Sequence, residues 1–172
     1  MQSELVVSKK PIGSYLPGFW KSYKHVQNQF VYLTNCPGLI ENIKHNLVDK
    51  MKLLERYLEV VHDKKKEFEE IFKTCEIQFD GALVYKYVHV LRLVGSFLDS
   101  DGSVFMMIEE DGASRTPAPH IKAVQVAKNF VFQVYVDKNK VLSNLTLAEA
   151  LGSFLHIAFV FGLESPKVAF KC

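Results

Sequence analysis

The chain has little of several features that mark large classes of protein. Its 172 residues include only 3 cysteines, which lie far apart and never form a C-x-x-C pair. This pattern disfavours a disulfide framework and a structural zinc site, so we expect free thiols. The formal net charge is only +2, and proteins that wrap duplex nucleic acid need a much larger basic excess.

Long apolar runs are also missing. The most apolar stretch, residues 150–163, contains His156 and is shorter than the roughly 20 residues that span a bilayer. Residues 1–10 hold an apolar run of three residues before two lysines, whereas a secretory signal has an apolar core of about 7 to 15 residues. The sequence therefore predicts an intracellular protein, cytoplasmic or nuclear, with no membrane partner.

Signatures of nucleotide binding and of common hydrolases are absent. The chain has no G-x-G-x-x-G or G-x-x-x-x-G-K-[ST] loop, no G-x-S-x-G turn and no H-E-x-x-H helix. The six histidines are single and widely spaced. The acidic residues 109–111 are interpreted as a solvated turn rather than as catalytic carboxylates. We therefore predict that the chain is not an enzyme and that it uses no cofactor and no metal.

What the chain does have is enough apolar sequence to fold. It is 48% apolar and 23% charged, which excludes a disordered protein, and its length fits one compact domain. Residues 1–38 carry three prolines, three glycines, and four lysines against one acid. We predict a basic, aromatic N-terminal arm or cap at 1–38 and a single α+β domain at 39–172.

A long amphipathic pattern begins at Leu39. Apolar residues recur there at steps of three and four, which is typical of a helix with one buried face: Leu39, Ile40, Ile43, Leu47, Met51, Leu54, Leu58, Val61, Phe68, Ile71 and Phe72. The stretch is either one long helix or two helices with a break near His62. Residues 82–98 are predicted to form a second helix, because their length is unusual for a strand. For residues 21–33 the spacing does not decide between helix and strand.

The C-terminal third predicts a small sheet followed by a helix. Residues 103–108, 121–126 and 130–136 are candidate strands, and a turn at 137–140 makes a hairpin with Val141 and Leu142. Thr146 and Glu149 then have the spacing of a capping box, which starts a helix. The predicted fold is α+β, with a long helix or helical hairpin, a second helix, and a mainly antiparallel sheet on which the capped C-terminal helix packs.

The end of the chain resembles a known group of sequences. An Ala-Leu helix with phenylalanines, then Phe-Val-Phe-x-Leu and Pro-Lys, is similar to the C-terminal region of vertebrate proteins related to sterile-alpha-motif-containing proteins, many of them transposon-derived. The residues that carry the resemblance are Ala150, Leu151, Phe154, Phe159, Val160, Phe161, Leu163, Pro166 and Lys167. Gly162 and Ser165 depart from the pattern. The resemblance implies an intracellular domain without catalytic residues, derived from a mobile element.

Two functions follow from these observations. The first is a non-catalytic protein-interaction or structural domain that offers its N-terminal aromatics or the rim of the long helix to a protein partner. The alternative is a single-stranded nucleic-acid-binding protein, because aromatic rings interleaved with lysines can stack bases and neutralise phosphates. The residues predicted to contact the partner or the nucleic acid are Lys9, Lys10, Trp20, Lys21, Tyr23 and Lys24.

Overall fold

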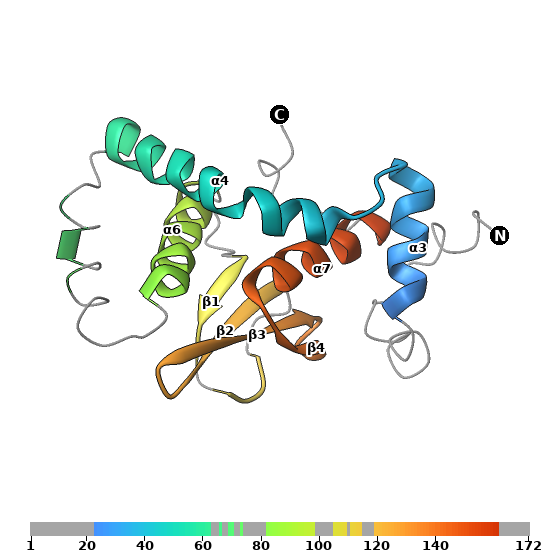
Figure 1. Ribbon diagram of the computed structural model, residues 1–172. Helices are drawn as coiled ribbons and strands as arrows, with labels where there is room; N and C mark the ends of the chain where they lie inside the picture. Colours follow the sequence, from blue (N-terminus) through green and yellow to red (C-terminus); the bar gives the residue numbers. More distant parts are fainter. Residues whose placement is uncertain are drawn as a thin grey trace.

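A computed structural model describes residues 23–62, 66, 69, 70, 73, 82–98, 105–109, 111–114 and 119–161 of the chain. In this part of the chain, the structure consists of four helices and a four-stranded sheet (Figure 1). The elements follow one another as α3 (Tyr23–Thr34), α4 (Leu39–His62), α6 (Ala82–Leu98), β1 (Met106–Ile108), β2 (His120–Val126), β3 (Asn129–Val136), β4 (Asn139–Leu145) and α7 (Leu147–Val160). The predicted α+β class is confirmed.

The strands lie in the order β1-β2-β3-β4. β2, β3 and β4 form an antiparallel meander, whereas β1 pairs in parallel with β2. The sheet is therefore mainly antiparallel, as predicted. The turn between β3 and β4 consists of Asp137 and Lys138, and both have positive φ values, of 49° and 68°. Two consecutive left-handed residues match the right-handed twist of a tight hairpin.

Alternation along β2 and β3 gives the sheet two unlike faces. Ile121 lies opposite Val134, and Ala123 lies opposite Phe132; all four are buried in the core. The intervening residues are mostly polar and point to the other face, because successive side chains of a strand alternate. One face of the sheet thus packs against helices, and the other carries the polar cluster described below.

The helix α7 lies at the centre of the packing and begins as predicted. The Thr146 hydroxyl accepts a hydrogen bond from the Glu149 amide, and the Glu149 carboxylate accepts one from the Thr146 amide. The helix covers the apolar face of the sheet and also contacts α3 and α4 (Figure 1). Gly152 allows the close approach of α4, because a Cβ placed there would lie 2.5 Å from Cγ1 of Ile40.

The helix α4 runs along one edge of the molecule (Figure 1). Its inner face buries Met51 and Leu58, and an ion pair of 2.8 Å between Glu55 and Lys86 joins it to α6. α4 ends at His62, where the sequence allowed a break. Most residues between 63 and 81 lie outside the described part. The structure therefore does not decide whether residues 39–74 form one helix or two. Residues 82–98 form a helix, as their length predicted.

The sequence left residues 21–33 open between helix and strand, and the described part of them, from Tyr23 on, belongs to the helix α3. It ends in a left-handed residue, Asn35, with φ 53°, whose amide donates to the carbonyl of Val31 at 2.8 Å. Val26 and Phe30 are its buried residues. Phe30 meets the ring of His156 in α7 edge to face, with ring centroids 4.5 Å apart. α3 therefore packs on α7.

Candidate functional site

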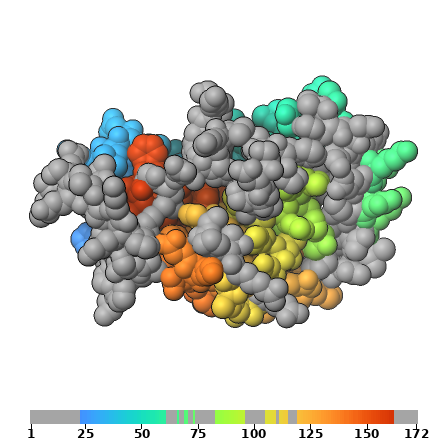
Figure 2. Space-filling view, turned by 180° about the vertical axis from the view of Figure 1, so that it is seen from behind, coloured from blue at the N-terminus to red at the C-terminus, as the bar shows by residue number. Residues whose placement is uncertain are grey.

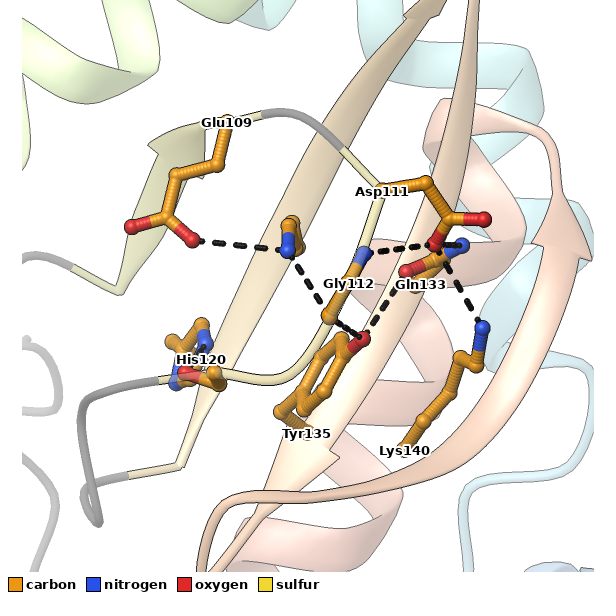
Figure 3. Close-up of polar contacts among 9 residues, drawn as sticks. Glu109, Asp111, Gly112, His120, Gln133, Tyr135 and Lys140 are labelled. Carbon is orange, nitrogen blue, oxygen red and sulfur yellow. Dashed lines mark hydrogen bonds and ion pairs between the residues drawn. The ribbon is translucent and has the colours of Figure 1, made fainter.

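The polar face of the sheet holds a group of polar and titratable side chains that are joined to one loop by hydrogen bonds and ion pairs. Strand register places His120 opposite Tyr135 and Lys122 opposite Gln133, and Lys140 of β4 lies opposite Tyr135 on its other side. We call these five residues the polar cluster. The connection from β1 to β2 crosses over them, and its described residues, Glu109 and 111–114, are called the strap (Figure 3).

Lys122 is the most enclosed charged group of the polar cluster, with its side chain only 2% exposed. Its ammonium donates to the carbonyl of Gly112 at 3.1 Å and lies 3.5 Å from Oε2 of Glu109. It also lies 5.5 Å from the centroid of the Tyr135 ring. A buried charge is costly unless it is paired and hydrogen-bonded, and the strap supplies both kinds of partner.

Tyr135 and Gln133 bind the same stretch of the strap (Figure 3). The Tyr135 hydroxyl donates to the carbonyl of Gly112 at 2.8 Å, and burial raises the pKa of this phenol. Gln133 donates to Oδ1 of Asp111 at 3.1 Å. This hydrogen bond, together with the charge of Lys140, lowers the pKa of the Asp111 carboxyl. The donors of these contacts lie on the sheet, and the acceptors lie on the strap.

Gly112 occupies a position that suits glycine, because its φ of 151° lies in the range that L side chains rarely adopt. This conformation turns the carbonyl of Gly112 toward Lys122 and Tyr135 (Figure 3). The acidic turn interpreted from sequence as merely solvated is thus an anchor, since Glu109 and Asp111 bind the sheet. Its local sequence gave no sign of this, because the partners lie 13 to 29 residues further on.

A serine and a histidine meet at the other end of the strap. Oγ of Ser114 lies 2.9 Å from Nε2 of His120, and the His120 ring stacks on Tyr135 with an interplanar angle of 9°. A serine hydrogen-bonded to histidine can act as an activated nucleophile. Here Ser114 is 6% exposed and His120 is 1% exposed, so the hydroxyl is not presented to a substrate. The pair serves to hold the strap on the sheet.

A second polar contact lies between α3 and α7. The Tyr23 hydroxyl and Nδ1 of His156 are hydrogen-bonded at 2.7 Å, and burial lowers the pKa of His156. A groove of roughly 420 Å³ opens beside this contact, where the start of α4 meets the two helices. Its charged side chains have partners, because Lys44 pairs with Glu41 and Glu149 accepts hydrogen bonds from Thr146. The lining therefore points to no particular ligand.

The outer side of α4 carries a third feature, a row of exposed apolar side chains. Leu53, Tyr57 and Val60 are 61%, 48% and 76% exposed. Their spacing of four and three residues puts them on one face of the helix, away from the buried Met51 and Leu58. We call these three residues the outer stripe. α4 lies along the upper edge of the molecule in Figure 1, and its residues also reach the surface at that edge from behind (Figure 2).

The structure describes two of the six residues predicted to contact a partner or nucleic acid. Tyr23 is half-buried, with its hydroxyl bound to His156, and Lys24 is exposed on α3. Lys9, Lys10, Trp20 and Lys21 lie outside the described residues. The polar cluster and the outer stripe include none of the six, and binding through the six residues stays a prediction.

Within the described ranges, no three His, Cys, Asp or Glu side chains gather closely enough to hold a metal ion. None of the described helices is both long and apolar enough to cross a membrane. No protein-family profile, curated protein or solved structure matches this chain.

Proposed function

We propose that this chain is a non-catalytic protein-interaction domain and that its partner binds the outer stripe of α4. The observation that carries the proposal is the exposure of Leu53, Tyr57 and Val60 on a helix whose opposite face is already buried. Single exposed apolar residues are common on protein surfaces, but a row on one helix face is typical of an interaction site.

The spacing of the outer stripe suits a helical or groove-shaped partner. Side chains at i, i+4 and i+7 are the anchors by which an amphipathic helix binds a complementary surface. Leu53 and Val60 would be covered in the complex, and each contributes through the apolar area removed from water, about 25 cal/mol per Å². This agrees with the rim of the long helix as the interaction surface expected from the sequence.

The other parts of this proposal rest on sequence. The intracellular setting is supported by the scattered cysteines. The mobile-element origin is supported by the resemblance of the C-terminal residues. A non-catalytic role agrees with the burial of Ser114 and His120, the pair among the described residues that most resembles a nucleophile and its base.

A photo-crosslinking experiment tests the interaction surface. A photoreactive amino acid replaces Val60 in the full chain expressed in cells, and in a matched variant it replaces Val126, which is 54% exposed at the end of β2. We expect discrete crosslinked products from position 60 that disappear when Leu53→Glu is added, and none from position 126. Equal labelling at both positions, or no product from position 60, would overturn the proposal.

A further inference from the structure

A row of four charged side chains runs along α4 beside the outer stripe. Its members follow one another at steps of three, four and three residues, which places them on one flank of the helix: Asp49, Lys52, Arg56 and Glu59. All four are exposed, and we call them the charged row. Its charges run negative, positive, positive, negative, so two bases lie in the middle and one acid lies at each end.

Arg56 is the member of the charged row that lies nearest to the middle of the outer stripe. It is three residues from Leu53 and four from Val60, so its side chain is a neighbour of both on the helix surface. Within the described part of the chain, neither Arg56 nor Lys52 makes an ion pair. A partner that covers the outer stripe removes water from Arg56 and must supply an acceptor, because covering an unpaired charge is costly.

A third base lies across the outer stripe from Arg56. Lys50 is exposed and precedes Leu53 by three residues, whereas Arg56 follows it by three, so the two bases lie on opposite sides of Leu53. The remaining acid between residues 49 and 60, Glu55, is half-buried and is paired with Lys86 at 2.8 Å. The middle of the surface is therefore positive on both sides of the apolar side chains.

A uniformly anionic surface matches this pattern poorly. A lipid bilayer or a nucleic-acid backbone would approach Asp49 and Glu59 together with the bases, and like charges held against each other oppose binding. The two acids are about 15 Å apart along the helix axis, and Lys52 and Arg56 lie between them, about 6 Å apart. The pattern therefore favours a partner that places negative charge at the level of the two bases and none beyond them.

A second copy of the chain also matches poorly. If two α4 helices lie antiparallel with their outer stripes covering one another, the midpoint falls between residues 56 and 57. Arg56 of each copy is then almost level with Arg56 of the other, next to the covered side chains, although Lys52 and Glu59 face one another further out. In a parallel pair every member of the charged row is level with its own counterpart. Both arrangements set like charges beside the covered stripe.

We propose that the partner of the outer stripe is a different protein that binds with an amphipathic helix, whose apolar side chains cover the stripe and whose flank carries two carboxylates four residues apart. The carboxylates pair with Lys52 and Arg56, because residues four apart on a helix have the same spacing as these two bases. This inference rests on the proposed function, since it names the partner of the same surface. It adds a charge pattern, which reversal of the two bases tests.

Two synthetic peptides of about 20 residues serve as probes, because much shorter helices are marginal in water. Both carry leucines at i, i+4 and i+7. The acidic probe has two glutamates four residues apart beside the leucines, and the basic probe has lysines in their place. Fluorescence anisotropy of the labelled probes with the full chain at about 50 mM salt measures binding. We expect the acidic probe to bind at least about tenfold more tightly than the basic one, and the difference to shrink at about 500 mM salt, where screening is strong.

Reversal of the two bases then tests where the acidic probe binds. In the double variant Lys52→Glu/Arg56→Glu the preference should invert, so that the basic probe binds more tightly. The matched control, Lys128→Glu/Lys138→Glu, makes the same change in net charge in the turns that join β2 to β3 and β3 to β4, and it should keep the original preference. Far-UV circular dichroism checks that each variant is folded. If the double variant is not folded, Lys52→Gln/Arg56→Gln replaces it and should abolish the preference.

The outcomes separate the two proposals. Equal binding of the two probes, no binding of the acidic probe up to about 1 mM, or a control that inverts the preference overturns the acidic helix. Phosphatidylserine vesicles bound as tightly as the acidic probe overturn it as well. In cells, crosslinked products from position 60 that disappear with Lys52→Glu/Arg56→Glu and persist in the control support it. Products that persist in both, or that have twice the mass of the chain, leave the interaction domain standing and overturn the acidic helix, whereas no product at all overturns both.

Discussion

Lys122 shows how a single buried residue binds the strap to the sheet. Its ammonium is buried on the polar face of the sheet and has the Gly112 carbonyl and the Glu109 carboxylate as partners. The Glu109 side chain is 37% exposed, so water can solvate its carboxylate when the lysine is removed. The Gly112 carbonyl would keep only the Tyr135 hydroxyl.

Lys122→Met keeps the length of the side chain and removes the charge and its hydrogen bond. We expect the free energy of unfolding to fall by about 1 to 3 kcal/mol, because a buried hydrogen bond from a charged group is lost. Urea denaturation measures this as a lower midpoint. The control is Lys140→Met. The ion pair of Lys140 with Asp111 is exposed, so its loss should lower the free energy of unfolding by less than about 0.5 kcal/mol. A larger loss in the control than in Lys122→Met would contradict this account.

His89 makes stability depend on pH. Its buried Nε2 has no hydrogen-bond partner among the described residues, and burial, followed by the charge of Arg92, lowers its pKa from 6.5 to about 4. Above pH 6.5 the imidazole is neutral in both the folded and unfolded states. Between pH 6.5 and about 4 the unfolded chain binds a proton that the folded chain does not, so stability falls as the pH falls.

The variant His89→Phe removes this titration and keeps a ring beside Tyr85, which lies 4.5 Å from the imidazole between centroids. We expect the drop in the free energy of unfolding between pH 7 and pH 4.5 to be smaller in this variant, by about 1 kcal/mol after solvent screening. Thermal unfolding at several pH values measures the difference. His156, whose pKa is also lowered by burial, should leave a residual dependence. Equal pH profiles for the two proteins would rule out His89 as the source.

At the scale of elements, the crossing of α4 and α7 depends on Gly152. Alanine in an exposed helix position stabilises by about 1 kcal/mol relative to glycine, but here the added Cβ would lie 2.5 Å from Ile40. We expect Gly152→Ala to destabilise the protein by about 1 to 2 kcal/mol, because overpacking forces the helices apart. In the Ile40→Ala background the same change should become neutral or stabilising. Equilibrium denaturation of the four proteins gives the coupling, and additive effects would show that the two residues do not meet.

Elements with strong local signals could be predicted from sequence, and those decided by packing could not. The start of α7 was predictable because Thr146 and Glu149 form their hydrogen bonds within a single turn. The β3–β4 hairpin was predictable from alternation and a polar turn. Residues 21–33 stayed ambiguous because Phe30 packs on His156, which is 126 residues away, and the neighbouring sequence gives no sign of this contact.

The outer stripe and the polar cluster also differ in how strong a signal each leaves in the sequence. The outer stripe was open to sequence analysis, because Leu53, Tyr57 and Val60 repeat at helical spacing beside the stripe that begins at Leu39. The polar cluster had a fainter signal, Lys122 and Gln133 at alternating positions within apolar strands. Recognising the strap would have required the strand register, which places these side chains under Glu109 and residues 111–114.

At the scale of the whole molecule, one continuous core joins the four described helices to the sheet. Its buried members come from α3, α4, α6, β1, β2, β3 and α7 and include Val26, Met51, Val88, Met106, Ile121, Val134 and Ile157. We therefore expect the described part to unfold in one cooperative transition, α3 included. Hydrogen exchange of individual amides measures this. The amides of α3 and α7 should share the same opening free energy, and those of the edge strand β4 should exchange earlier. Exchange of α3 well before α7 would show that α3 unfolds independently.

The central place of α7 has a consequence for how the chain is made. α3 and α4 precede α7 by about 100 residues, and ribosomes add about 5 to 20 residues per second. The apolar faces that include Val26, Met51 and Leu58 therefore stay exposed for about 5 to 20 seconds before the helix and sheet that bury them are synthesised. During synthesis these helices are the segments that a chaperone for apolar surfaces would hold longest, until residues 147–160 have left the ribosome.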